Sequence, residues 1–466
     1  MRLARLLGAV SVLDVVGDPS AIDVHDVTHD SASVRPGSLF CCLRGARRDG
    51  HDFAPAAVEN GAVALLVERT LDLAVPQVVV ADARSAMAPL AAEVQGNPSR
   101  SLTVIGVTGT NGKTTTTYLV RSILEAAGRP TGVLGTMSGS RTTPEAPVLQ
   151  AALAGLLRKD KVAAAIEVSS VGLVQHRVDA TWFAAAIFTG LSQDHLDDHG
   201  TMEAYFEAKA LLFTADRCAV AVVNADDDHG RVLLDRAPVP MRPYSLEDAV
   251  DLELRVGSSA FMWDGERVEL PLDGAYNVSN ALAAATACRE LGVSAGEVAR
   301  GLSAVGVIPG HGEAIEVGQE FRVVVDYAHT PLALESVLTA ARRAAGESGK
   351  VLTVFGCGGD RDPSKRGPMG WAASCEADVV VVTSDNPRHE DPDAIIAAVI
   401  AGATGGATVL VEPDRRAAIA LAFARASGGD VVVIAGKGHE TGQTIGDQVL
   451  PFDDKAVAIE LLGGRA

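Results

Sequence analysis

The stretch Leu102-Thr-Val-Ile-Gly-Val-Thr-Gly-Thr-Asn-Gly-Lys-Thr-Thr115 decides the fold of the central part of this chain. Residues 102–107 are mostly apolar or β-branched and predict a buried strand. A glycine-rich turn follows, and the run from Lys113 to Ala127 predicts a helix. A strand, a glycine-rich turn and a helix in this order are typical of parallel α/β sheets.

The turn Gly109-Thr-Asn-Gly-Lys-Thr114 predicts phosphate binding. Backbone N–H groups of such a loop cradle phosphates, and the helix N-terminus adds positive potential. In this pattern Lys113 reaches the β- and γ-phosphates and the Thr114 hydroxyl binds Mg²⁺. The common pattern has a further glycine where this chain has Val107, so a plain glycine-rich turn is the alternative. The flanking strand and helix favour nucleotide binding.

The same alternation of strands and helices extends outward from this stretch in both directions. Short strands are expected at residues 37–42, 62–67 and 77–80, and the turn-rich segment Gln95–Ser101 reads as a linker. The turn Ile308-Pro-Gly310 marks a second boundary. We therefore expect an α/β protein of three domains: a small α/β unit over 1–100, a P-loop ATPase-type unit with a mostly parallel sheet over 101–310, and a Rossmann-like α/β unit over 311–466.

Polar or glycine-rich segments follow four predicted strands of the third unit. Ligands of open α/β sheets bind beyond the carboxyl ends of the strands, so four such segments predict one shared site. Arg361 and Arg388 offer planar guanidinium groups for carboxylates, although Asp385-Asn-Pro-Arg388 by itself is an ordinary turn signal. The four segments are Asp326–His329, Gly356–Arg361, Asp385–Arg388 and Gly436–Glu440.

Lys209 occupies an unusual position in the run Tyr205-Phe-Glu-Ala-Lys-Ala-Leu-Leu-Phe213. On a helix, its neighbours three and four residues away are all apolar or aromatic. Burial lowers the pKa of an amine, and a neutral amine can react with CO₂ to give a carbamate. A lysine that covers apolar surface while its ammonium reaches water is the alternative, and the residues alone favour it.

The acidic segment Asp194-His-Leu-Asp-Asp-His-Gly200 allows two interpretations. It could be the acidic first turn of the following helix, where carboxylates complement the helix dipole. It could also be a Mg²⁺ site, with His195 as an unusual ligand for a hard cation. Glu167 ends a predicted strand and would project into the same crevice.

The overall composition narrows the function classes. The formal net charge is −19, and no basic face suggests nucleic-acid binding. The six cysteines show neither disulfide nor zinc spacing, which favours reduced thiols and a cytoplasmic location. Asp14 and Asp18 interrupt the N-terminal apolar run, which argues against a signal peptide, and no run is long enough for a membrane span. We expect a monomer.

Taken together, these segments resemble the Mur ligase family over nearly the whole chain, from Asp30-Ser31 to Gly436-Lys-Gly-His-Glu440. Members of this family have three domains and join an amino acid to a carboxylate through an acyl phosphate made from ATP. The branch that uses diaminopimelate carries Asp-Asn-Pro-Arg in its amino-acid pocket, as this chain does at Asp385–Arg388. The resemblance implies addition of diaminopimelate to UDP-N-acetylmuramoyl-L-alanyl-D-glutamate during peptidoglycan precursor synthesis.

The resemblance also implies a role for individual residues. Lys113, Glu167, His195 and Lys209 match catalytic residues, with Lys209 carbamylated, and Thr114, Glu167, His195 and Lys209 match magnesium ligands. The ATP site matches Gly109, Thr110, Asn111, Gly112, Lys113, Thr114 and Thr115, with Asn277 and Asp326 near the base. Ser31 and the segment Gly45-Ala-Arg-Arg48 match the UDP region in the first domain, and Thr142, Thr143, Ser169, Gln175 and Arg177 match contacts to the muramoyl dipeptide. The amino-acid pocket matches Arg361, Asp385, Asn386, Pro387, Arg388, Gly436 and Glu440.

The chain departs from the usual residues of that branch at Val171, Gln193, Asp198 and His311. A divergent ligase of the folylpolyglutamate synthase type is therefore one alternative, and a P-loop binding protein without catalysis is another. Ser31 and the Thr142-Thr-Pro144 segment speak against the first. Joint retention of Glu167, His195 and Lys209 speaks against the second.

Overall fold

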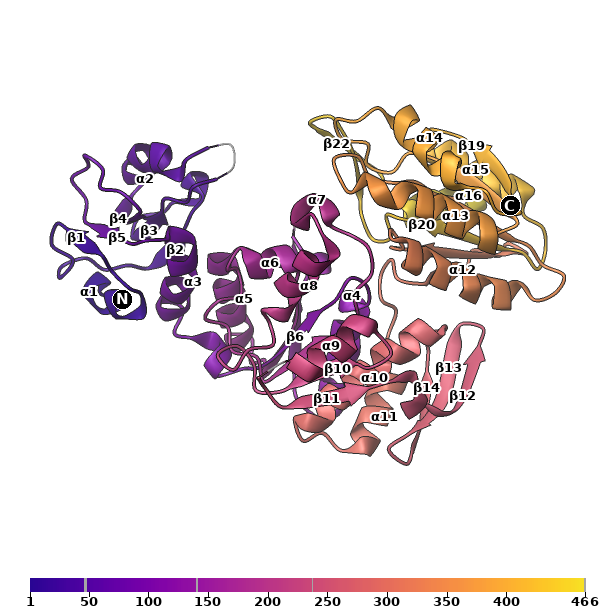
Figure 1. The fold of residues 1–466 in the computed structure, drawn as a ribbon, viewed down its shortest axis with the longest axis horizontal. Coiled ribbons are helices and arrows are strands. Elements are labelled where there is room, and N and C mark those ends of the chain that lie inside the picture. The colour runs from indigo at the N-terminus through magenta and orange to yellow at the C-terminus, as the bar shows by residue number, and fades with distance from the viewer. Residues whose placement is uncertain (46–47, 140, 237, 465–466) are drawn as a thin grey trace.

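The computed structural model describes residues 1–45, 48–139, 141–236 and 238–464. Three α/β domains follow one another along the chain, each built on its own largely parallel sheet (Figure 1). The central domain contacts both others through hydrogen bonds. The Trp182 N–H donates to Ser99 on one side, and Lys365 donates to Asp194 on the other. Among the described residues, no helix is long and apolar enough to cross a membrane.

The N-terminal domain is a five-stranded sheet in the order β1-β5-β4-β3-β2, parallel except for the edge strand β1. Alternate residues of β3 face opposite sides, so Leu39 and Cys41 join one apolar core while Phe40 joins another. Its strands are β1 (Asp14–Val16), β2 (Asp26–Thr28), β3 (Ser38–Cys41), β4 (Ala62–Val67) and β5 (Gln77–Val79), and its helices are α1 (Leu3–Leu6), α2 (Ala54–Glu59) and α3 (Ala83–Val94).

The central domain has a six-stranded, fully parallel sheet in the order β11-β10-β9-β6-β8-β7. Its middle strand β6 is buried on both faces, with Ile105 in one core and Val104 in the other. The strands are β6 (Thr103–Thr108), β7 (Thr131–Leu134), β8 (Ala163–Glu167), β9 (Ala185–Phe188), β10 (Ala221–Asn224) and β11 (Met241–Tyr244). The helices are α4 (Lys113–Ala126), α5 (Ala146–Leu157), α6 (Ser170–Val174), α7 (Leu196–His199), α8 (Met202–Ala210), α9 (Asp228–Arg236), α10 (Ala275–Glu290) and α11 (Ala295–Ser303).

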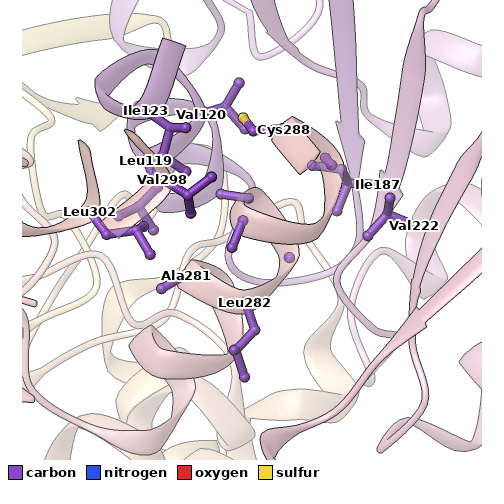
Figure 2. Packing of buried hydrophobic residues seen from close by; sticks show 14 of the residues in the cluster. Leu119, Val120, Ile123, Ile187, Val222, Ala281, Leu282, Cys288, Val298 and Leu302 are labelled. Atoms are coloured by element: carbon purple, nitrogen blue, oxygen red, sulfur yellow. The ribbon is translucent and has the colours of Figure 1, made fainter. Parts of the chain in front are cut away.

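The larger core of this domain fixes helix α4, which follows the glycine-rich turn Gly109–Thr114, called the phosphate loop below. Leu119 and Ile123 of α4 pack against α10 and α11, which supply Leu282, Val298 and Leu302 (Figure 2). Helix α10 is rich in alanine along its buried length, so a neighbouring helix can approach it closely. Because α4 is held on this side, its N-terminus stays directed at the end of β6.

A small antiparallel sheet, β12-β13-β14, was not expected from the sequence. It covers the α10–α11 side of the central domain with strands β12 (Val250–Arg255), β13 (Ser258–Trp263) and β14 (Glu266–Leu270). Phe261 and Val268 point into the core, while Arg255 and Arg267 form an exposed ladder of ion pairs with glutamates. Such an exposed ladder contributes little to stability.

The C-terminal domain has a six-stranded sheet in the order β15-β16-β20-β17-β18-β19, parallel except for β15. A separate hairpin, β21-β22, lies after β20 and was also not expected. The strands are β15 (Glu313–Ile315), β16 (Arg322–Asp326), β17 (Val351–Phe355), β18 (Val379–Val382), β19 (Thr408–Val411), β20 (Val431–Ala435), β21 (Gly442–Ile445) and β22 (Gln448–Pro451). The helices are α12 (Pro331–Ala345), α13 (Arg366–Glu376), α14 (Pro392–Gly402), α15 (Arg415–Arg425) and α16 (Asp454–Gly463).

Candidate active site

The phosphate loop requires glycine at two positions. Gly109 and Gly112 have φ of 151° and 82°, which side chains rarely tolerate. A Cβ on Gly109 would lie 1.9 Å from Thr189 Oγ1, and one on Gly112 would lie 2.3 Å from Asn280 Oδ1. The Thr189 hydroxyl donates a 2.6 Å hydrogen bond to the Asn111 carbonyl. The loop is therefore held by its neighbours in a single shape.

Lys113 opens α4 and folds back over the loop. Its Nζ donates hydrogen bonds to the carbonyls of Gly109 and Thr110 at 2.9 and 2.8 Å. Burial lowers the pKa of Lys113, and the carboxylates of Glu167 and Asp194 offset part of that decrease. The ammonium thus stands over the loop, where phosphate oxygens would compete for it.

Glu167 stands at the end of β8 with 1% of its surface exposed. Its oxygens accept hydrogen bonds from the Thr136 N–H at 3.1 Å and the Thr136 hydroxyl at 3.0 Å. Burial raises the pKa of Glu167, while Lys113 and hydrogen bonds from Thr136 and Thr114 lower it. The structure therefore brings Glu167, Lys113 and Thr114 together.

Lys209 lies beneath the same loop and is 1% exposed. Its Nζ donates a 2.8 Å hydrogen bond to the Gly109 carbonyl and stands 4.5 Å from the ring centre of Tyr205. Burial and the nearby Lys113 ammonium hold the pKa of Lys209 well below its usual value. The interpretation of a lysine whose ammonium reaches water is therefore wrong. Helix α8 ends at Ala210, so Leu212 and Phe213 lie beyond it, and both are buried.

The acidic segment forms its own short helix, α7, and is not the first turn of α8. His195 precedes α7 with φ of 55°, and its ring lies 5.8 Å from that of Tyr205. His195, Asp197 and Asp198 place one possible ligand atom each within 4.8 Å of one another. That group includes His195 but not Glu167, which lies instead with Thr114.

Asp194 joins this segment to the C-terminal domain. It accepts a 3.0 Å hydrogen bond from Lys365 Nζ, and His329 Nε2 lies 3.4 Å from its other oxygen. Burial alone would raise the pKa of Asp194, but His329 and Lys365 hold it far below its usual value. Nearby, Gln193 donates a 2.7 Å hydrogen bond to Ser364. The two domains therefore meet through polar side chains next to His195.

The residues expected to contact the dipeptide form a connected network. Thr143 donates to the Glu167 carbonyl at 2.9 Å and lies 3.1 Å from the Ser169 hydroxyl. Arg177 donates to the Thr143 carbonyl at 2.9 Å and to Gln175 at 2.6 Å. The Thr142 hydroxyl oxygen lies 3.0 Å from that of Thr136, which donates its hydrogen to Glu167. The structure joins all five of these expected residues, counting Ser169 and Gln175, in one network that reaches Glu167 through Thr143 and Thr136.

Ser31 lies in the N-terminal domain, where it begins a short 3-10 turn, Ser31–Ser33. Its carbonyl accepts a 3.4 Å hydrogen bond from Asn60 of the same domain. Of the expected Gly45–Arg48 segment, Ala46 and Arg47 lie outside the described residues. Arg48 stacks over Phe53, with its guanidinium carbon 6.0 Å from the ring centre.

Asn277 and Asp326 lie near the boundary between the second and third domains. Asn277, in the first turn of α10, donates a 2.8 Å hydrogen bond to the Asp273 carbonyl. Asp326 ends β16 and accepts hydrogen bonds from the N–H groups of Gly312 and Ala328, both at 2.7 Å. Burial nevertheless raises the pKa of Asp326 to about 6, and Asp273 adds to the increase.

The Asp385–Arg388 turn follows β18, as expected, and faces the loop after β20. Asn386 donates a 2.9 Å hydrogen bond to Glu440, and Gly436 approaches Asp385 closely. Arg388 has φ of 51° and donates a 2.7 Å hydrogen bond to the Gly359 carbonyl. A Cβ on Gly358 would lie 2.9 Å from Arg388 NH1 and 3.8 Å from Arg361 Cγ, so both arginines border one glycine. The remaining expected residue, Pro387, is buried in the same turn.

Lys437 belongs to the same group of polar side chains and was missed by the sequence reasoning. It is fully buried, with Nζ 3.4 Å from Asp385, 3.2 Å from Asn386 and 3.1 Å from Glu440. A lysine between two glycines in Gly436-Lys-Gly-His-Glu440 was the available signal. The hairpin β21-β22 also contributes, because the Thr444 N–H donates to Asn386 at 2.9 Å.

Comparisons with known proteins agree with this arrangement. Three family models match: the Mur ligase family catalytic domain over residues 23–104, the Mur ligase middle domain over 107–288 and the Mur ligase glutamate ligase domain over 312–438. A UDP-N-acetylmuramoyl-L-alanyl-D-glutamate–2,6-diaminopimelate ligase of Streptomyces coelicolor is 46% identical, with 97% of this chain and 94% of the relative covered. One of the same name from Geobacillus thermodenitrificans is 45% identical, with 94% of each chain covered.

Solved structures similar to this chain are also Mur ligases. A structure of UDP-N-acetylmuramoyl-L-alanyl-D-glutamate–2,6-diaminopimelate ligase has a TM-score of 0.69 and 33% identity, covering 100% of this chain and 99% of the other. A MurF structure from Acinetobacter baumannii has a TM-score of 0.71 at 22% identity, covering 99% and 98%, and shares the fold. With near-complete coverage by relatives above 40% identity, this chain belongs to the Mur ligase family.

Proposed function

We propose that this chain uses ATP to join 2,6-diaminopimelate to UDP-N-acetylmuramoyl-L-alanyl-D-glutamate, a step of peptidoglycan precursor synthesis. The observation that carries the proposal is the meeting of two sites at one domain boundary, where Thr330 lies 3.3 Å from Asn111 of the loop and Arg361 lies 3.9 Å from Asp197. A phosphate loop with Lys113 and Lys209 stands at the end of one parallel sheet, and a charged pocket with Arg388 stands at the end of the other. The name and 46% identity of the Streptomyces coelicolor relative support the substrate pair.

The chemistry has two balanced steps. A carboxylate oxygen of the dipeptide attacks the γ-phosphorus of ATP, the bond to the bridging oxygen breaks, and ADP leaves. The amine nitrogen of diaminopimelate then attacks the acyl carbon, phosphate leaves and the amine gives up a proton. Lys113 would exchange its contacts with the Gly109 and Thr110 carbonyls for phosphate oxygens, which stabilises the transferring charge.

The residues present fit the Mg²⁺ that accompanies ATP in phosphoryl transfer. Magnesium prefers oxygen ligands, and the Glu167 carboxylate and Thr114 hydroxyl are hydrogen-bonded neighbours at the phosphate loop. His195, with Asp197 and Asp198, provides a second group of ligand atoms. When bound, the ion would offset negative charge on the phosphates. We therefore keep Thr114, Glu167, His195 and Lys209 as the proposed ligands.

We also propose that Lys209 is carbamylated. Its burial and its lowered pKa favour the neutral amine that reacts with CO₂. The amine nitrogen bonds the carbon of CO₂, one C–O π bond opens to give a carboxylate oxygen, the nitrogen releases one proton, and the side chain becomes an anion. As an ammonium, Lys209 donates to the Gly109 carbonyl. As a carbamate it would offer oxygen acceptors toward the phosphate loop.

The amino-acid pocket has charges that match the far end of diaminopimelate. That end carries an ammonium and a carboxylate. The two negative charges of Asp385 and Glu440 outnumber the one positive charge of Lys437. The remaining negative charge suits the ammonium of diaminopimelate. Arg388 and Arg361 border Gly358 and offer guanidinium groups for the carboxylate. Lysine lacks that carboxylate and would leave Arg388 without a carboxylate partner, while Arg361 would keep only Asp197, 3.9 Å away.

We also propose where the domains begin and end, and in which oligomeric state and compartment the chain acts. We place the domain boundaries near residues 100 and 310, which the linker at Gln95–Ser101 and the turn at Ile308–Gly310 support. We further propose that the chain acts as a monomer in the cytoplasm, where ATP and the nucleotide-linked precursor are available. Equilibrium sedimentation would test whether the chain is a monomer.

Phosphate release tests the proposed reaction. The purified chain is incubated with ATP, Mg²⁺, the UDP-muramoyl dipeptide and either diaminopimelate, lysine or a folate acceptor with glutamate. We expect phosphate release only when the dipeptide and diaminopimelate are both present. Equal release with lysine would overturn the proposed amino acid, and release with the folate pair alone would overturn the acceptor.

A further inference from the structure

Three arginines converge on one buried carboxylate at the boundary between the N-terminal and central domains. Glu145 lies 3.3 Å from Arg84 NH1, 2.6 Å from Arg141 NH1 and 3.1 Å from Arg177 NH2. Its side chain is 9% exposed. Arg84 comes from α3 of the N-terminal domain, and the other groups belong to the central domain. The Arg84–Glu145 pair therefore crosses the domain boundary.

The cluster has more positive charge than its own residues can neutralise. One carboxylate faces three guanidinium groups, which leaves an excess of two positive charges. Burial lowers the pKa of Arg177, Glu145 opposes the decrease, and the Arg141 and Arg84 charges add to it. Arg177 Nε is buried and has no hydrogen-bond partner in the part of the chain that the structure describes. A buried donor without a partner is costly, so it adds to the cost of the uncompensated charge in this cluster.

The position of the cluster indicates which ligand it meets. Arg177 bonds the Thr143 carbonyl, and Arg141 directly precedes Thr142. On the other side, His29 of the N-terminal domain lies within the electrostatic reach of Glu145, Arg84 and Arg141, two residues from Ser31. The cluster thus lies between the region proposed for the UDP end and the region proposed for the peptide end.

We propose that Arg84 and Arg141, held in place by Glu145, form an oxyanion subsite for the UDP-muramoyl dipeptide. Arg84 is 28% and Arg141 54% exposed at the side chain, so both can reach a ligand without unfolding the boundary. Oxygen atoms of the diphosphate or of a dipeptide carboxylate have the required chemistry. Because Arg84 belongs to the other domain, the bound oxyanion would also tie the N-terminal domain to the central one. This inference rests on the proposed function.

Calorimetry with two ligands tests the subsite. The wild type, Arg84→Gln and Arg141→Gln are titrated with the UDP-muramoyl dipeptide and, separately, with UDP. Arg416→Gln is the matched control, because Arg416 is an exposed arginine paired with Glu460 in the C-terminal domain. We expect each cluster variant to bind the full ligand about tenfold more weakly, while KM for ATP and diaminopimelate stays unchanged.

The ligand pair identifies the source of the oxyanion. Weaker binding of UDP as well as of the full ligand assigns the subsite to the diphosphate. Weaker binding of the full ligand alone assigns it to the dipeptide. Folded cluster variants that bind both ligands within about twofold of the control would overturn the inference, and half-exposed Arg141 keeps this test available should Arg84→Gln unfold. A wild type that does not bind the full ligand at all would instead overturn the proposed function.

Discussion

The side-chain nitrogen of Lys209 lies 2.8 Å from the carbonyl oxygen of Gly109, the residue that opens the phosphate loop. The two residues are far apart in the sequence, and Lys209 reaches the loop from the last turn of α8. This contact places an amine with a strongly lowered pKa directly beneath the glycine-rich loop.

Lys209→Met should abolish ligation while the protein remains folded. Methionine keeps the apolar stem beside Tyr205 but cannot form a carbamate, so the anion proposed there is lost. We expect phosphate release to fall by at least about 100-fold, which corresponds to roughly 3 kcal/mol of lost stabilisation. The measurement is steady-state phosphate release, with thermal unfolding as the folding control.

A ¹³C-bicarbonate NMR experiment complements that prediction. The wild type should show one carbamate signal that the Lys209→Met variant lacks. A fully active wild type without such a signal would contradict carbamylation and leave the unmodified lysine as the active form.

Arg388→Ala should weaken the use of diaminopimelate selectively. Its guanidinium is already oriented by the 2.7 Å hydrogen bond to Gly359, so little side-chain entropy is lost on binding. Loss of a charge-assisted contact of about 1.5–3 kcal/mol predicts a decrease of roughly 10- to 100-fold in kcat/KM. Kinetics with varied diaminopimelate and varied ATP would show it. A comparable change in KM for ATP would mean that the substitution disturbs more than the pocket.

Lys437→Met should destabilise the C-terminal domain and weaken diaminopimelate binding. Without the ammonium, Asp385 and Glu440 lose a shared cation 3.4 and 3.1 Å away. Breaking a buried pair costs about 3–5 kcal/mol, and because Glu440 is partly exposed we expect about 2 kcal/mol. Urea unfolding gives the value. Asp378→Asn is a suitable comparison, since it removes a surface partner of Arg342 in the same domain. If Lys437→Met lowers the free energy of unfolding no more than Asp378→Asn does, the prediction is wrong.

His311 should make the protein sensitive to acid. Burial lowers the pKa of His311 to about 3, and His439, His329 and Lys113 add to the decrease. The unfolded state, with a pKa near 6.5, therefore binds more protons between about pH 3 and 6.5. Stability should be complete above pH 6.5 and should be lost as the pH falls through this window, by about 1 kcal/mol per pH unit.

Comparison with His311→Gln isolates this contribution from the carboxylates that titrate in the same range. Urea unfolding of both proteins at pH 7, 6 and 5 should give a shallower pH dependence for the variant. Parallel curves would show that His311 does not titrate as its surroundings imply.

The sequence predicted the strands and loops of the two parallel sheets because their apolar runs are followed by turns that contain glycine. β6 and its glycine-rich turn are the clearest case, and the Asp385–Arg388 turn lies after β18 as expected. The β12–β14 sheet was missed because its outer face alternates charged residues in short strands. Helix α7 was missed because a run of Asp and His next to α8 reads as the start of that helix.

Partnerships between residues far apart in the chain could not be predicted. Lys437 meets Asp385 and Asn386 within its own domain, and Glu145 meets Arg84 of the neighbouring domain, and no local pattern shows either contact. The burial of Lys209 shows the same limit. The sequence shows its apolar neighbours, but only the packing of α8 under the loop decides whether its side-chain nitrogen reaches water.

Asp194 has a practical consequence for inhibition. It is held by Lys365 and His329, both from the C-terminal domain, and it directly precedes His195. A small cationic molecule that takes the place of Lys365 would remove one of the contacts that join the two domains beside His195. Such a molecule would need to resemble neither a nucleotide nor an amino acid. Resistance by substitution of Asp194 would remove the same contact that the working enzyme uses.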